Sequence, residues 1–183
     1  MEVSTKEKTV HVMHWYQNDF GRWTFLFIGD IAKLKDDVRR EFGKAYKGDM
    51  ADELCNSLDE LYRGFTTNGG DPARFGRCTY TPKGIAAMWF PMPPATSTLV
   101  HEILHSVQSI ADDLGIDDDE YEAYSVQFLL EHFQEKLDED RKKGKHKIRK
   151  DLGSEHESED QDRVQRQDLP SRRDLRMLIE AGV

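Results

Sequence analysis

Three prolines, Pro91, Pro93 and Pro94, separate two segments whose hydrophobic patterns differ. Residues 84–90 (GIAAMWF) are almost continuously apolar and predict a strand, whereas apolar residues in 96–114 recur every three or four positions and predict a helix. Proline lacks the N–H that a strand ladder needs, so the strand must stop at this point. The threonines and serine at 96–98 offer caps for the helix, and Gly115 predicts its end.

The remaining segments alternate between the same two patterns. Residues 9–16, 23–28 and 77–81 are rich in β-branched and aromatic side chains and predict strands, the first two forming either a hairpin or two neighbouring strands. Residues 30–42, 49–65 and 117–137 have helical spacing. Strands and helices in this arrangement predict an α+β fold.

A possible metal-binding motif, His101-Glu102-Ile103-Leu104-His105, lies within the 96–114 helix. The histidines are four positions apart, so both imidazoles lie on one helix face, about 6 Å apart along the axis. This spacing lets both bind one zinc ion, while Glu102 can accept a proton from water. Matches to HExxH also occur in ordinary surface helices, so the pattern alone is a hypothesis.

A zinc site of this class needs a third protein ligand. The metzincin pattern requires glycine at Gln108 and histidine at Ala111, which excludes that subclass. Glu120 and Glu122, early in the 117–137 helix, are the alternatives, and they lie on opposite shoulders of its apolar stripe. Periodicity does not choose between them.

Glu120 also has a purely structural interpretation. An acidic residue in the first turn of a helix stabilises the helix dipole. Asp117 and Glu120 have the spacing of a capping box.

Taken together, residues 101–105 and 120–124 (EYEAY) resemble the gluzincin pattern of HExxH and a downstream glutamate helix. In detail they resemble the small ImmA/IrrE-type peptidases and related zincin-like proteins of phages and bacteria. In those proteins the third ligand is a glutamate followed by alanine at the third position and apolar residues at the sixth and tenth. Glu120 fits this register, whereas Glu122 would place Ser125 at the alanine position.

The resemblance implies a small zincin-like domain, in which a mainly antiparallel sheet packs on the active-site helix and the glutamate helix. It implies that His101, His105 and Glu120 hold Zn²⁺ and that Glu102 is the catalytic base. It also implies that segment 84–91, the strand before the active helix, can bind substrate in extended form. The similarity covers only about residues 77–137.

Charge divides the chain into two parts. The net charge of −9 belongs entirely to residues 1–137, which we expect to form the domain. Residues 138–183 carry 12 basic and 12 acidic residues, with a basic block at 141–150 and an acidic block at 151–162. Such blocks are typical of a solvated tail that can dock on a protein partner. Residues 171–183 regain an amphipathic pattern and predict a short docking helix.

Several classes of protein are excluded by composition. No apolar run reaches the roughly 18–20 residues that a membrane span needs, and the N-terminus shows no secretory signal. Two cysteines cannot form a disulfide framework. We therefore expect a cytoplasmic protein, and the acidic body makes nucleic acid an unfavourable partner.

Other polar residues are weaker candidates. Tyr80, Tyr121 and Tyr124 could stabilise an oxyanion, but each is expected to be a packed aromatic residue. His11 and His14 lie three apart in a strand and face opposite sides. The remaining expectations are an exposed His132 and a buried Cys55.

These observations predict a zinc-dependent metallopeptidase that hydrolyses a peptide bond in an intracellular protein, with a phage-related protein as one candidate substrate. The alternative is a catalytically silent metal-binding module of a phage or bacterial assembly. Hydrolysis of nucleic acid through the basic block is a third hypothesis, which the acidic body disfavours.

Overall fold

The computed structural model describes residues 11–43, 49–67, 69 and 76–151, and describes side chains as far as residue 143. The elements follow one another as two strands, two helices, two strands and two helices. This order confirms the predicted α+β class.

Four strands form one mixed sheet in the order β1-β2-β4-β3. Strands β1 (Val12–Gln17) and β2 (Trp23–Ile28) form the predicted antiparallel hairpin. A parallel pairing joins β2 to β4 (Ile85–Phe90), and β4 pairs antiparallel with β3 (Arg77–Thr81). Two of the three pairings are therefore antiparallel.

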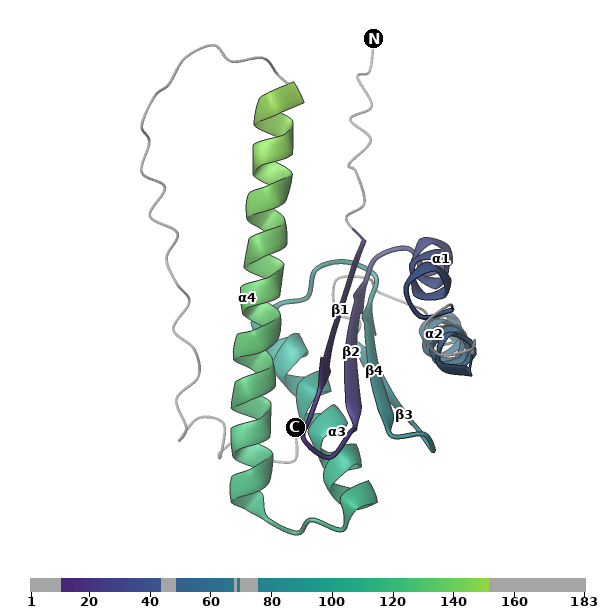
Figure 1. Ribbon diagram of the computed structural model, residues 1–183, viewed down its shortest axis with the longest axis vertical. Helices are drawn as coiled ribbons and strands as arrows, with labels where there is room; N and C mark the ends of the chain where they lie inside the picture. Colours follow the sequence, from purple (N-terminus) through teal and green to yellow (C-terminus); the bar gives the residue numbers. More distant parts are fainter. Residues whose placement is uncertain (1–10, 44–48, 68, 70–75, 152–183) are drawn as a thin grey trace.

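Helices cover both faces of the sheet (Figure 1). Helices α1 (Ile31–Phe42) and α2 (Asp49–Thr67) pack on one face, and α3 (Thr96–Leu114) and α4 (Asp119–Asp151) pack on the other. Every side chain of β4 is buried because this central strand contributes to both cores. In a strand that is buried on both faces, side chains on both sides are apolar, which explains the continuous apolar run of residues 84–90.

Capping differs from the sequence expectation at both long helices. Ala95, which has no capping side chain, precedes α3 in place of the hydroxyl residues predicted there. Asp118 caps α4: its Oδ1 accepts from the backbone N–H of Glu120 at 2.9 Å, so the Asp117–Glu120 capping box is not formed. Gly115 ends α3 in the left-handed conformation, as predicted.

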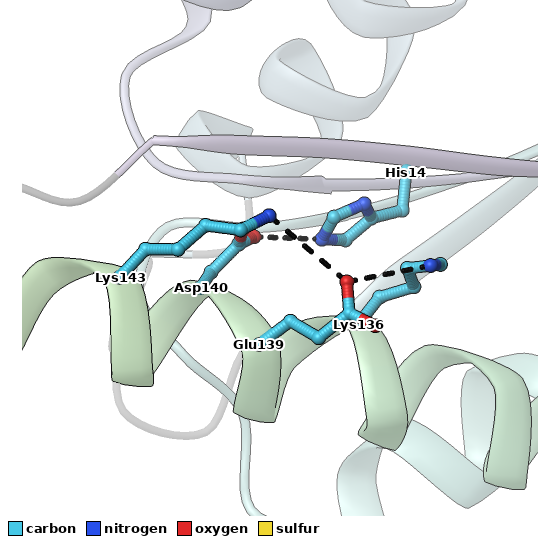
Figure 2. Close-up of polar contacts among 5 residues, drawn as sticks. All are labelled: His14, Lys136, Glu139, Asp140 and Lys143. Carbon is cyan, nitrogen blue, oxygen red and sulfur yellow. Dashed lines mark hydrogen bonds and ion pairs between the residues drawn. The ribbon is translucent and has the colours of Figure 1, made fainter.

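Helix α4 continues well beyond its predicted end at residue 137. Its far half is tied to the sheet, because His14 Nε2 lies 2.8 Å from Asp140 Oδ2 (Figure 2). On the helix itself, Glu139 Oε2 lies 3.4 Å from Lys136 Nζ and 4.0 Å from Lys143 Nζ. Pairs at these spacings stabilise a helix that hydrophobic periodicity does not reveal. Within the described residues, none of the helices has the length and apolar character needed to cross a bilayer.

Candidate functional site

The two histidines of the motif converge on the same point. The Nε2 atoms of His101 and His105 lie 3.1 Å apart, and the two rings meet edge to face. Two nitrogens bound to one tetrahedral zinc at 2.0–2.1 Å are about 3.3 Å apart. The helix therefore places this pair at nearly the separation that a shared metal requires, as the four-residue spacing predicts.

Glu102, the residue after His101 on α3, is only 5% exposed. Burial raises the pKa of its carboxyl above the ordinary value, while nearby His101, a hydrogen bond from the backbone N–H of Cys78 and the charge of Arg77 act in the opposite direction. A carboxyl with a raised pKa is better matched to accepting a proton near neutral pH. The base predicted from the motif therefore has a suitable environment.

Glycine at position 76 allows strand β3 to begin directly against α3. A Cβ atom there would lie 2.5 Å from Phe90 Cε1, 2.9 Å from Glu102 Cγ and 3.0 Å from Thr98 Cγ2. These separations are shorter than ordinary carbon contacts of 3.5–4.0 Å. The absence of a side chain at Gly76 therefore lets the backbone N–H of Cys78 approach Glu102.

A cleft of about 370 Å³ lies between β3 and α3. Strand β3 and the residue before it form one wall, and α3 forms the other. The lining residues are Gly76, Arg77, Cys78, Thr79, Tyr80, Glu102, His105 and Ser109. The cleft thus brings the general-base candidate and one of the paired histidines to the same open space.

The strand that borders this cleft is not the one suggested by the resemblance. Segment 84–91 contains β4, which is paired with β2 on one side and β3 on the other. Its backbone groups are engaged in the ladder, so it cannot pair with an extended substrate. That expectation was wrong: β3 is the edge strand beyond β4, and the Cys78 N–H donates away from the sheet to Glu102.

The third ligand is not assembled with the histidines. Glu120 is exposed at the start of α4. Glu122 instead lies near Gln108, one turn beyond His105, and burial raises the pKa of its carboxyl, with Asp119 adding to the shift. Among the described residues, no set of three or more His, Cys, Asp and Glu side chains is placed to share a metal ion.

The short α3–α4 connection explains this arrangement. Two antiparallel helices that turn back within a few residues bring the first turn of the second opposite the last turns of the first. Glu122 therefore meets Gln108 rather than the histidines. Of the two candidate glutamates, Glu122 is nevertheless the one shown in contact with the α3 face that continues from His105.

Tyr80 is the only one of the three candidate tyrosines among the cleft residues. Burial raises its pKa to about 12, and the neighbouring Asp113 carboxylate contributes to this shift. The phenol therefore remains protonated near neutral pH. Tyr121 lies instead against Phe20 of the β1–β2 hairpin, and Tyr124 is half exposed on α4, contrary to its expected packing.

The remaining sequence expectations have mixed outcomes. His14 faces Asp140 of α4 and His11 faces Asp37 of α1, which confirms that they point to opposite sides. Cys55 is buried, as predicted. His132 is not exposed: it is half-buried, its ring contacts Tyr16, and its Nε2 is shielded from solvent.

Arg77 and Ser109 line the cleft but were not identified from the sequence. Neither belongs to a recognisable motif. The two residues come together only because β3 packs beside α3 in the folded chain. The thiol of Cys78, another cleft residue, has its pKa raised to about 12 by burial, so it is a poor nucleophile.

Comparisons with known proteins give no functional assignment. No family model matches the chain, and neither the curated proteins nor the solved structures include a significant match. The function must therefore be inferred from the side chains of the cleft.

Proposed function

We propose that this protein is a zinc-dependent metallopeptidase whose active site is the cleft between β3 and α3. One observation carries the proposal: the Nε2 atoms of His101 and His105 lie 3.1 Å apart, beside a cleft that also contains the buried carboxylate of Glu102. A helical HExxH that lacked a function would need neither a buried glutamate nor an adjacent cavity.

The imidazoles of His101 and His105 would supply two nitrogen ligands to a zinc ion, and a carboxylate from α4 would complete the set of three protein ligands. The resemblance favours Glu120 for this role. The proximity of Glu122 to Gln108 of α3 supports Glu122 instead, because that carboxylate lies on the side of α4 that meets α3. Both stay candidates for the third ligand.

When bound, zinc supplies a Lewis acid that polarises the scissile carbonyl and makes water easier to deprotonate. Glu102 accepts the proton of the attacking water and returns it to the leaving amine. The backbone N–H of Cys78 fixes the direction of the Glu102 carboxylate. Apart from the Cys78 N–H, which Glu102 engages, the outer edge of β3 would offer its backbone groups to an extended peptide that binds by strand addition.

The substrate is therefore a peptide segment in an extended conformation. An intracellular protein substrate accords with the two unpaired cysteines, Cys55 and Cys78, which lie in different cores and need no oxidising compartment. A cytoplasmic location belongs to this proposal.

Metal content and hydrolysis test the proposal separately. Protein purified without chelator should contain close to one zinc per chain, His101→Ala should lose it, and the exposed His11→Ala should keep it. Glu102→Gln should retain zinc and lose hydrolysis of peptide libraries by at least about a hundredfold. Hydrolysis at the wild-type rate in Glu102→Gln would refute the role assigned to this residue.

The third ligand can be identified by the same measurement. We compare Glu120→Gln and Glu122→Gln with Glu131→Gln, an exposed control on the same helix. One of the first two variants should lose zinc affinity, while the control should match the wild type. Equal zinc affinity in all three would exclude a glutamate of this helix as a ligand.

A non-catalytic metal-binding module is the second candidate. It rests on the His101–His105 pair alone, whose Nε2 atoms lie 3.1 Å apart and would bind a metal ion whether or not Glu102 accepts a proton. In that case zinc would raise the unfolding temperature of the wild type and of Glu102→Gln equally, and no peptide in the library would be cleaved by either.

A further inference from the structure

Aromatic side chains gather on the surface where the β1–β2 hairpin meets the first turns of α4. Phe20 is 54% exposed and Phe128 is 47% exposed, although both are large apolar residues. Tyr121 contacts the Phe20 ring, and Tyr16 packs against Phe128 with ring centroids 4.9 Å apart. We call Phe20, Tyr121, Tyr124 and Phe128 the aromatic patch.

The hairpin holds Phe20 in a fixed outward position. Asn18 Oδ1 accepts hydrogen bonds from the backbone N–H groups of Phe20 and Arg22, at 3.1 and 2.8 Å. Gly21 adopts a positive φ of 74°, which allows the tight turn. A rigid exposed aromatic residue loses little conformational entropy on binding, so it is suited to anchor a partner.

The surroundings of the aromatic patch are acidic. Residues 115–135 contain seven Asp and Glu residues and no Lys or Arg. Asp19 at the hairpin tip and Glu131 beside Phe128 on α4 are both exposed. The partner that fits this surface is therefore an apolar segment flanked by basic residues.

The chain itself contains such a segment outside the described residues. Residues 171–183 (SRRDLRMLIEAGV) would place Leu175, Leu178 and Ile179 on one face of a helix, with Arg172 and Arg176 along one flank. We propose that this segment docks on the aromatic patch of its own chain. Apolar side chains would cover the aromatic rings, and the arginines would face the acidic rim.

The chain is long enough for this return. The aromatic patch lies 23 or more residues before the end of α4 at Asp151, a distance of about 35–45 Å along the helix. Residues 152–170 can span about 60 Å when extended. The connection therefore reaches the patch without strain, and its length keeps the segment at a high effective concentration.

Hydrogen exchange measured by mass spectrometry on the full chain tests this docking. In the wild type, amides of 171–183 should exchange at least about tenfold more slowly than in a free peptide of the same sequence. Phe128→Ser should abolish this protection. Tyr62→Ser is the matched control, because Tyr62 is also 47% exposed but lies on α2, on the other face of the sheet. It should leave the protection unchanged.

The contribution of charge is tested by Arg176→Glu, which should reduce the protection, and by salt, which should weaken it in the wild type. Three results would overturn the proposal. One is free-peptide exchange of 171–183 in the wild type, and another is protection that survives Phe128→Ser. The third is protection that disappears on dilution of the protein, because docking would then occur between two copies of the chain.

Discussion

Gly76 is the residue through which the fold most directly controls the candidate site. In Gly76→Ala the new methyl group would lie 2.5 Å from a ring carbon of Phe90, which is fully buried. The ring, or the β3 backbone, would have to move by about 1 Å to reach an ordinary contact distance. Overpacking of this kind costs about 1–3 kcal/mol.

An opposing effect comes from the unfolded state, because alanine has fewer accessible conformations than glycine, which contributes about 0.4–1 kcal/mol of stability. The net expectation is a loss of about 1–2 kcal/mol. With a urea m-value of about 2 kcal/mol/M, the unfolding midpoint should fall by about 0.5–1 M. Glu102, whose Cγ is also displaced, should lose its hydrogen bond from Cys78.

A double-mutant cycle identifies the cause. Phe90→Leu removes the ring carbon that Gly76→Ala meets, so the two changes together should cost less than the sum of their separate costs. Gly115→Ala is the control, because nothing lies within 4 Å of its Cβ position, and its cost of about 1 kcal/mol arises from its φ of +67° alone. An unchanged midpoint in Gly76→Ala, or strict additivity with Phe90→Leu, would refute the reasoning.

Three further changes have defined outcomes. Because burial raises the folded-state pKa of Glu102, the stability of the wild type should fall as the pH rises above 4.5, the ordinary pKa of a glutamate. Glu102→Gln removes this charge, so the variant should melt at a higher temperature than the wild type at pH 7. Well below pH 4 the two proteins should melt at the same temperature. Burial lowers the pKa of His14 despite the Asp140 carboxylate, so stability should fall as pH drops below about 6.5, and His14→Gln should reduce this loss in thermal melts from pH 8 to 5. Phe133 is fully buried between α4 and the sheet, so Phe133→Ala should lower the free energy of unfolding in urea by about 3–5 kcal/mol. A loss of less than about 1 kcal/mol would show that α4 is not part of the core.

Local patterns predicted the secondary structure of the central region closely. Strands β3 and β4 and helix α3 have the predicted limits to within one residue, because prolines, a helix-ending glycine and clear hydrophobic periods mark their ends. Helix α4 was predicted too short. Its second half carries charged residues whose helical stability comes from ion pairs and from the contact between Asp140 and His14, and neither leaves a hydrophobic period.

The candidate site was predictable only where it lies on one helix. The convergence of His101 and His105 follows from helix geometry, which depends on sequence spacing alone. The position of the third carboxylate depends on how two helices pack, and periodicity therefore left Glu120 and Glu122 undecided. In the structure the tight α3–α4 connection brings Glu122 to Gln108.

Local sequence was enough to predict the paired imidazoles, the adjacent carboxylate and the alternation of strands and helices, because each is a property of neighbouring residues. Three features became visible only in the folded chain: β3 is an edge strand, Gly76 and Cys78 lie against Glu102, and a cleft opens between β3 and α3. These features join residues more than twenty positions apart. Their proximity is fixed by burial of the two cores on either side of the sheet, which no local pattern encodes.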